Sequence, residues 1–178
     1  MLSENKSFIQ TERLLVEHLN KKYVNDIFHE KNNPEVNEYL SNQTAKTIED
    51  LAEWMDGVIK YNGNGGIIQF QVSKIENQEF IWMCAVKKTD TIHPEIWLRI
   101  KQSARWKWYG KEMVSSLLYR IKKYMPYEYI IYETFEDNIW SKKIIESLGW
   151  VQNHEYNKII NNYYGKPLKH IQYKIYEH

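Results

Sequence analysis

The sequence predicts an α+β protein with a central mixed sheet, mostly antiparallel, that contains one parallel strand pair and carries helices on both faces. Three apolar strand patterns follow one another directly between residues 67 and 100, and short connections favour antiparallel pairing. A helical pattern and a further strand come next, and this order predicts a right-handed crossover between parallel strands. We expect one domain, residues 1–178, because no linker-like or low-complexity stretch divides the chain.

The first part of the chain is predicted to contain one strand and two helices. Residues 12–19 alternate well enough for a strand, and residues 21–30 space their apolar side chains at the helical period. Thr47 is a predicted N-cap of the second helix, because an acidic residue, Asp50, lies three positions on and an apolar face follows. The antiparallel strands after it are expected at residues 67–74, 80–88 and 95–100.

In the second part of the chain, residues 109–124 form a predicted helix with apolar positions at helical spacing. The crossover would place a strand at 129–135 parallel to the strand at 95–100. Another helix is expected from Asn138, with Trp140 on its apolar face and Gly149 placed to end it in the left-handed conformation. The last two strands are expected near residues 155–160 and 169–176.

Composition argues against several classes of protein. The 24 basic and 23 acidic residues give a net charge of +1, which provides no overall field for nucleic acid or an anionic membrane. With no signal-peptide pattern or long apolar run in view, we expect a cytoplasmic protein without a membrane partner. The single cysteine, Cys84, lies in an apolar run and predicts an inert core thiol. The histidines lack ligand spacing, so no metal site is expected.

The segment 96–113 places an apolar strand, a basic turn and a helix in direct succession. A helix N-terminus leaves backbone N–H groups without intrahelical partners and carries partial positive charge, so a phosphate can bind there. Arg105, Lys107 and Lys111 add three cations around the same point. The sequence therefore predicts an anion-binding site, with a solvated basic turn as the structural alternative.

The same segment resembles the acetyl-CoA signature of the GNAT superfamily of N-acetyltransferases, Gln/Arg-x-x-Gly-x-Gly/Ala. The stretch from Arg105 to Gly110 fits this frame, with Trp108 in the position of the first glycine. Residues 138–150 resemble the family's Asn-x-x-Ser/Ala box that ends in Leu-Gly-Phe. Residues 11–15 resemble the opening strand of the ribosomal-protein alanine and serine N-acetyltransferase subgroup. The resemblance implies the GNAT fold, in which the parallel strand pair splays apart and admits the cofactor.

The resemblance also implies an enzyme that transfers acetyl from acetyl-CoA to a primary amine by direct attack in a ternary complex. It would place the pantetheine amides on the backbone of Leu98 and Ile100, and Asn138 beside the pantetheine arm. The pyrophosphate would bind the amides of the basic turn. The residues of this turn, called the cofactor loop below, are Arg105, Trp106, Lys107, Trp108, Tyr109, Gly110 and Lys111.

For proton transfer the sequence offers several candidates. Ile145 stands where many family members have a proton-donating tyrosine, and a serine at the place of Ser141 is implicated instead in the ribosomal-protein subgroup. Ser141 also suits a helix start, where serine caps backbone groups. For the general base, Glu95 lies at the head of the strand that borders the opening, and Glu133 lies on the partner strand. Solvated strand-end carboxylates are the structural alternative for both.

Three function hypotheses follow. In the first, the chain is an N-acetyltransferase, and its acceptor amine belongs to a protein N-terminus, a polyamine, an amino acid or an antibiotic. Whether this enzyme forms a homodimer is left open. In the second, the chain is a catalytically impaired GNAT-fold binding or interaction module, which Trp108 and Ile145 favour. A nucleic-acid-binding module is the weakest hypothesis, because no groove-reading motif is present.

Trp108 stands where the family has a glycine, and tryptophan does not adopt a positive φ without cost. We therefore expect CoA binding that is retained but weakened.

Overall fold

A computed structural model of the chain describes residues 8–34, 45–62, 64 and 66–176. Within this part of the chain, eight strands form one sheet in the order β1-β2-β3-β4-β5-β6-β8-β7. The strands are β1 Phe8–Gln10, β2 Leu14–His18, β3 Ile67–Lys74, β4 Phe80–Lys87, β5 Glu95–Leu98, β6 Tyr129–Phe135, β7 Val151–Asn161 and β8 Pro167–Tyr176. The α-helices are α1 Val24–Lys31, α3 Ile48–Tyr61, α4 Tyr109–Tyr124 and α5 Ile139–Glu146, with single 3-10 turns η1 at Lys21–Tyr23 and η2 at Gln102–Ala104.

The parallel strand pair lies in the middle of the sheet. Strands β5 and β6 run parallel and pair at Glu95 with Ile131 and at Ile96 with Tyr132. The other neighbouring strands that the structure describes are antiparallel. Past Ile96 the described strands β5 and β6 part, which confirms the predicted mixed sheet with one splayed parallel pair.

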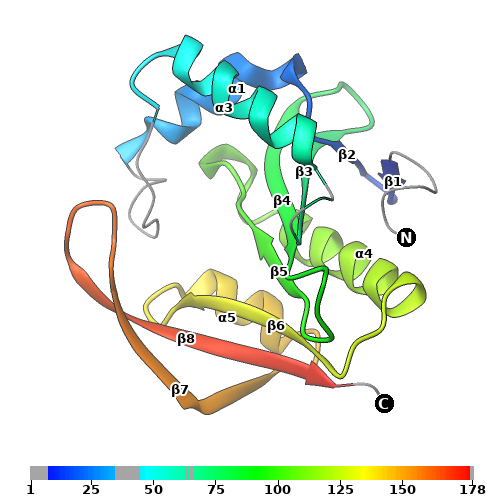
Figure 1. Cartoon of the computed structure of the whole chain (residues 1–178), viewed down its shortest axis with the longest axis vertical. Coiled ribbons are helices and arrows are strands. Elements are labelled where there is room, and N and C mark those ends of the chain that lie inside the picture. Colours follow the sequence, from blue (N-terminus) through cyan, green and yellow to red (C-terminus); the bar gives the residue numbers. More distant parts are fainter. Residues whose placement is uncertain (1–7, 35–44, 63, 65, 177–178) are drawn as a thin grey trace.

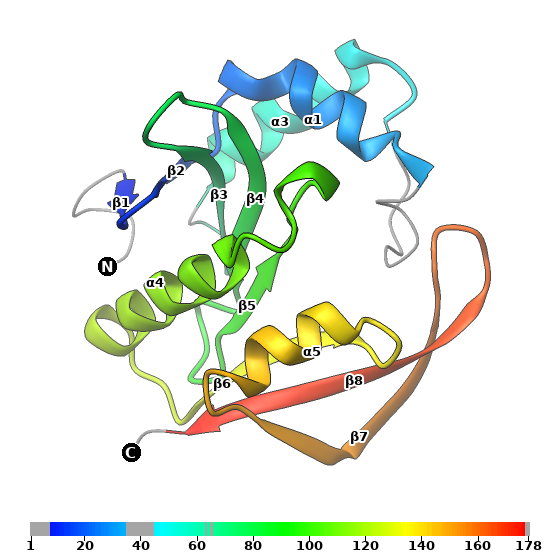
Figure 2. The same cartoon turned by 180° about the vertical axis from the view of Figure 1, so that it is seen from behind.

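Helices cover both faces of the sheet (Figures 1 and 2). One core cluster joins the sheet to α4 and α5, with fully buried side chains such as Met113 and Ile145. A second cluster joins the sheet to α1 and α3 through Ile27, Met55 and Trp82. Figure 2 shows the β7–β8 hairpin and the α1–α3 pair on opposite sides of the opening between β5 and β6.

Local signals account for most helix boundaries. Thr47 caps α3 through the predicted capping box, because its hydroxyl accepts from the Asp50 N–H and the Asp50 carboxylate accepts from the Thr47 N–H. Helix α4 has the predicted bounds, and its apolar positions Met113, Leu117 and Ile121 are buried. Cys84 is fully buried, and burial raises the pKa of its thiol, as expected for an inert core residue. No helix in the described residues is both long and apolar enough to cross a membrane.

The strand predictions fail where the alternation of side chains is broken. Strand β1 was not predicted, and β7 begins at Val151, ahead of the expected start near residue 155. Both are edge strands of the described sheet. The register of β7 against β8 shifts between Asn153 and Lys158, and a bulge of this kind interrupts the period of two on which a strand prediction depends.

Candidate active site

A cleft of about 500 Å³ opens where β5 and β6 part. It is lined from β5 and the segment after it, from the cofactor loop, from β6 and from α5. Of the site residues predicted from the sequence, those that line it are Glu95, Leu98, Ile100, Arg105, Trp106, Trp108, Tyr109, Gly110, Asn138 and Ser141, together with Glu133. The side chains of Lys107 and Lys111 are not among the described residues that line it.

The free edge of β5 faces the cleft with its backbone. The Arg99 N–H donates to the Met83 carbonyl at 3.0 Å, and the Lys101 N–H donates to the Ile81 carbonyl at 3.0 Å. Because alternate residues of a strand direct their backbone groups to opposite sides, those of Leu98 and Ile100 point away from β4 and into the opening. An extended ligand with amide groups can therefore pair with this edge as an added strand does.

The cofactor loop leads directly into an uncapped helix. Trp108 is the N-cap of α4, and its side chain makes no capping hydrogen bond. The first N–H groups of α4, from Tyr109 onwards, have no intrahelical acceptor and can donate to an anion. A Cβ on Gly110 would lie 2.6 Å from Cδ1 of Ile144 and 2.8 Å from Cδ1 of Ile100, so glycine allows α4 to pack closely against its neighbours here.

Two tryptophans of the loop adopt the left-handed conformation. Trp108 has φ 63° and ψ 8°, and Trp106 has φ 71°. Left-handed backbone costs about 1–2 kcal/mol for a residue with a Cβ. Trp108 thus takes the positive φ that a glycine at this position would adopt freely, and the loop leads into α4 without a break.

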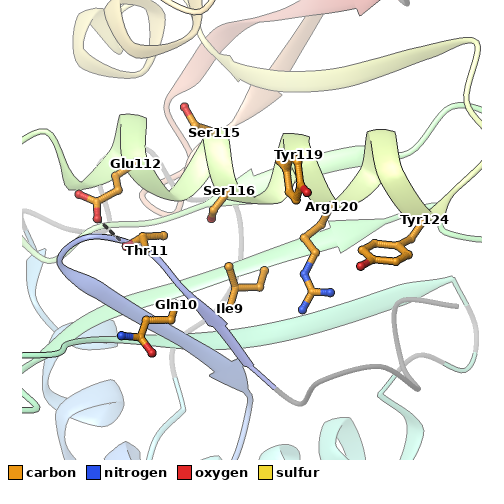
Figure 3. A pocket seen from close by; sticks show the side chains of 9 residues that line it. All are labelled: Ile9, Gln10, Thr11, Glu112, Ser115, Ser116, Tyr119, Arg120 and Tyr124. Atoms are coloured by element: carbon orange, nitrogen blue, oxygen red, sulfur yellow. Dashed lines mark hydrogen bonds between the residues drawn. The ribbon is translucent and has the colours of Figure 1, made fainter.

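Contacts from the β1–β2 turn hold the loop and the first turn of α4 in place. The Thr11 hydroxyl donates to the Glu112 carboxylate (Figure 3), and Arg13 donates through Nε to Glu112 at 2.8 Å and through Nη1 to the Lys107 carbonyl at 2.9 Å. Burial raises the pKa of Glu112, but the hydrogen bonds from Thr11 and Arg13 outweigh it, so the net pKa is lowered. The segment 11–15 and the cofactor loop, which are far apart in the sequence, are therefore in contact in the structure. Their separation of 99 residues concealed this.

Exposed aromatic rings border the mouth of the cleft. The exposed fractions are 69% for Trp106, 65% for Trp108 and 37% for Trp140. The rings of Trp106 and Trp140 have centroids 3.5 Å apart at 67°. The prediction that Trp140 lies on the buried face of its helix is wrong, because Ser141 takes the inward position and Trp140 packs on the cofactor loop instead.

The hydroxyl of Ser141 is held inside the cleft. Asn138 caps α5 by accepting from the Ser141 N–H at 3.2 Å. The Ser141 Oγ lies 2.9 Å from the hydroxyl of Tyr132 on β6, in a buried contact. Burial raises the pKa of Tyr132 to about 12, so the phenol stays protonated at neutral pH. Sequence reasoning missed Tyr132, because nothing in a strand pattern indicates which serine a tyrosine will meet.

The two candidate bases have different surroundings. Glu95 is 7% exposed and accepts from Lys87 at 2.9 Å and Lys88 at 3.1 Å. Burial raises the pKa of Glu95, but the two lysines outweigh this effect and lower it overall. Its carboxylate is therefore compensated within the chain and is a weak proton acceptor.

Glu133 belongs to a group of polar side chains on β6, β7 and β8. It accepts from Tyr156 at 3.1 Å and from Gln172 at 2.8 Å, and its carboxylate lies 3.7 Å from Nδ1 of His170. Burial is the main cause that lowers the pKa of His170, so the imidazole is neutral at pH 7. Sequence reasoning overlooked His170 because metal-ligand spacing was the pattern considered. In the described part of the chain, no three His, Cys, Asp or Glu side chains gather to hold a metal ion.

A second hollow, of about 560 Å³, lies on another side of α4 against β1. Ile9, Ser116 and Arg120 are among the side chains that line it (Figure 3). It contains none of the predicted catalytic residues and does not include the opening of α4.

A splayed parallel pair, an uncapped helix N-terminus and a buried hydroxyl in one cleft define a class of group-transfer enzymes that bind an extended phosphate-bearing cofactor. Residues 13–151 match the family model described as "Acetyltransferase (GNAT) domain", and the chain belongs to this family. The acetyltransferase class and the GNAT fold predicted from the sequence are thereby confirmed. No curated protein sequence matches the chain as a relative.

Solved structures support the fold at low sequence identity. A GNAT-family acetyltransferase from Bacillus anthracis is 21% identical with a TM-score of 0.79, covering 95% of this chain and 98% of that one. The ribosomal-protein-S5-alanine acetyltransferase from Vibrio fischeri is 14% identical with a TM-score of 0.80, covering 96% and 97%. The spermidine N-acetyltransferase from Vibrio cholerae, solved with CoA and spermine, is 16% identical with a TM-score of 0.77, covering 93% and 96%.

Proposed function

We propose that the protein transfers acetyl from acetyl-CoA to a primary amine by direct attack within a ternary complex, with residues 1–178 acting as one domain. One observation carries this proposal: the free backbone edge of β5 and the uncapped start of α4 face the same cleft. Together they provide donors and acceptors for the amides of a pantetheine arm and N–H groups for a pyrophosphate.

Arg105 and the backbone of residues 105–111 would hold the pyrophosphate, and Leu98 and Ile100 the pantetheine amides. Asn138 would keep α5 and Ser141 beside the thioester sulfur. This assignment fits the donors present, because the loop supplies positive charge and backbone N–H groups. The acidic residue in the first turn of α4, Glu112, is already paired with Arg13 and so does not oppose a phosphate.

Proton transfer would use the two sides of the cleft. The Tyr132 phenol, protonated at neutral pH, would donate to Ser141 Oγ, which leaves the serine proton free for the departing thiolate. On the opposite side, neutral His170 beside Glu133 would accept the proton of the attacking amine. Glu95, the first candidate base in the sequence, would serve instead to balance Lys87 and Lys88.

The serine assignment and the segment 11–15 support a proposed relation to the ribosomal-protein N-acetyltransferase subgroup. We extend the acid role of the serine from that subgroup to Ser141. The acceptor is not extended with it, because the groups that would contact an acceptor differ between family members and lie on the variable elements of a fold.

A thermal-shift titration tests the proposal directly. Acetyl-CoA and CoA should each raise the melting temperature, and a short oligonucleotide should not. A ligand at one hundred times its dissociation constant stabilises the folded state by about 2.7 kcal/mol. An unchanged melting curve at millimolar acetyl-CoA would exclude the enzyme. A clear shift without acetyl transfer to any amine would indicate the binding module instead.

Arg105→Ala should weaken CoA binding, because it removes a charge-assisted phosphate contact of about 1.5–3 kcal/mol. The loss corresponds to roughly a tenfold to hundredfold rise in the dissociation constant. Arg120→Ala is the matched control, since Arg120 lies on α4 but lines the second hollow (Figure 3). Calorimetric titration measures both variants. Equal losses would show that general positive charge, and not the position of Arg105, governs affinity.

Trp108→Gly should bind CoA more tightly than the wild type, by up to about tenfold, without loss of folding. Glycine takes the left-handed conformation freely and places no side chain between the backbone and the phosphate. Trp106→Gly is the matched control, because Trp106 has the same backbone conformation and a similarly exposed ring. Weaker CoA binding by Trp108→Gly in the same titration would mean that the indole supports the ligand.

A further inference from the structure

Strand β5 and residues 99–100, which continue along β4 beyond its end, have two faces with different surroundings. Ile96, Leu98 and Ile100 belong to or pack against the core that contains α4 and α5. Side chains alternate along a strand, so Trp97 and Arg99 extend to the other face, where Trp97 packs against the core of α1 and α3. Both Trp97 and Arg99 line the cleft. On this face a ligand would lie across β5 from the cofactor loop.

Arg99 places a cation in this part of the cleft, and two of its buried donors lack an acceptor among the described residues. Its Nε and Nη1 atoms are buried and have no hydrogen-bond acceptor, and no ion pair to Arg99 occurs among the described residues. The guanidinium carbon lies 5.5 Å from the ring centroid of Trp82 and 5.4 Å from that of Trp97. Ring faces attract the charge, but they do not accept the planar N–H donors.

The charge itself is retained at neutral pH. Burial lowers the pKa of Arg99 to about 9, which still leaves the side chain protonated at pH 7. Burial and then the charge of Arg99 lower the pKa of Lys31 to about 8, so a second cation lies close to the first. The unsatisfied buried donors of a cation are stabilised by an anion.

The acidic side chains that line the cleft do not supply an anion for Arg99. Glu95 is paired with Lys87 and Lys88. Glu133 accepts from Tyr156 and Gln172 on the side of the cleft formed by β6 and β8. Among the described residues, no carboxylate that lines the cleft pairs with Arg99, so a ligand anion would satisfy it.

We propose that Arg99 binds a carboxylate of the acetyl acceptor, so that the acceptor is a small amine that also carries a carboxylate, as an amino acid does. Arginine presents two parallel N–H donors whose geometry matches a carboxylate. The acceptor amine would then face Glu133 and His170 across the splay, while its carboxylate lies on Arg99 beside Trp97. Polyamines, which carry only positive charge, are disfavoured beside Arg99 and Lys31. This assignment rests on the proposed acetyl transfer.

The test compares acceptors that have and that lack the α-carboxylate. Free amino acids and their α-amides are assayed in pairs with acetyl-CoA and the whole chain. Spermidine is a third kind of acceptor. The release of the CoA thiol gives kcat/KM for each acceptor. We expect acids to exceed their amides by about tenfold to a hundredfold, the effect of a charge-assisted contact. Amides or spermidine equal to or better than the acids would overturn the assignment, as would the absence of any acetylated amino acid.

Variants at Arg99 locate the effect. Arg99→Met keeps an unbranched side chain between Trp82 and Trp97 but removes the charge, and it should lower the acid-to-amide ratio at least tenfold. Arg99→Lys keeps the charge without the planar donors and should give an intermediate ratio. A ratio unchanged in both variants would overturn the proposal. If Arg99→Met does not fold, Arg99→Lys and the wild-type pairs still decide.

The controls separate this inference from the function on which it rests. CoA-induced thermal stabilisation of the wild type is measured beside the acceptor panel. No stabilisation means that the proposed function fails. Stabilisation together with acetyl transfer that shows no preference for carboxylates means that the function stands and the role of Arg99 is refuted.

Discussion

Ser141→Ala is expected to lower turnover by about a hundredfold or more, the range found when a positioned proton donor is removed. The change in kcat should exceed the change in KM, because the hydroxyl acts mainly as the thiolate departs. The structure supplies the reason, since Ser141 Oγ is fixed in the cleft by Tyr132 at 2.9 Å. Steady-state kinetics with saturating acetyl-CoA measures the effect.

Tyr132→Phe is the control that separates chemistry from structure. It breaks the same hydrogen bond but leaves the serine hydroxyl in the cleft. We expect a smaller loss of turnover than in Ser141→Ala, although both variants leave a buried group without its partner and lose about 1–3 kcal/mol of stability. Equal turnover in Ser141→Ala and the wild type would remove the serine from the mechanism.

Leu117→Ala should lower the free energy of unfolding by about 2–5 kcal/mol, because it leaves a cavity in the core beneath α4. Leu117 is 1% exposed and lies in the cluster that joins α4 to the sheet. For a domain of this size the melting temperature should fall by roughly 5–20 °C. Chemical denaturation gives the free energy, and a thermal scan gives the midpoint.

Leu118→Ala provides the comparison within the same helix. Leu118 is partly buried and packs against the edge of that core, so the same truncation removes less contact. Its loss should be clearly smaller than that of Leu117→Ala. If the two variants are destabilised equally, α4 is not held by the face that the structure buries, and the positioning of its N-terminus needs another explanation.

Helices and central strands were predictable because their signals are local. The bounds of α4 and β6 were predicted to the residue, and the capping box of Thr47 was recognised from three positions of sequence. The order of elements then determined the parallel pair and with it the position of the opening. Leu98 and Ser141, which line this opening, were assigned through the resemblance of their segments to the GNAT family.

The remaining features depend on contacts between distant segments. The bonds from Arg13 to Glu112 join segments 99 residues apart, and no periodic pattern reports such a pair. The positive φ of Trp108 contradicts the local preference of the residue and depends on its surroundings. Arg99 appears in the sequence as one cation among 24 basic residues, and only its burial beside Trp82 distinguishes it.

The ties from the β1–β2 turn to Glu112 have a kinetic consequence. A loop that is fixed by Thr11 and Arg13 loses its conformational entropy during folding, so binding a ligand does not require that ordering again. The association rate is then limited by diffusion and orientation instead of loop rearrangement. Differences in affinity between ligands of this cleft should accordingly appear in their residence times.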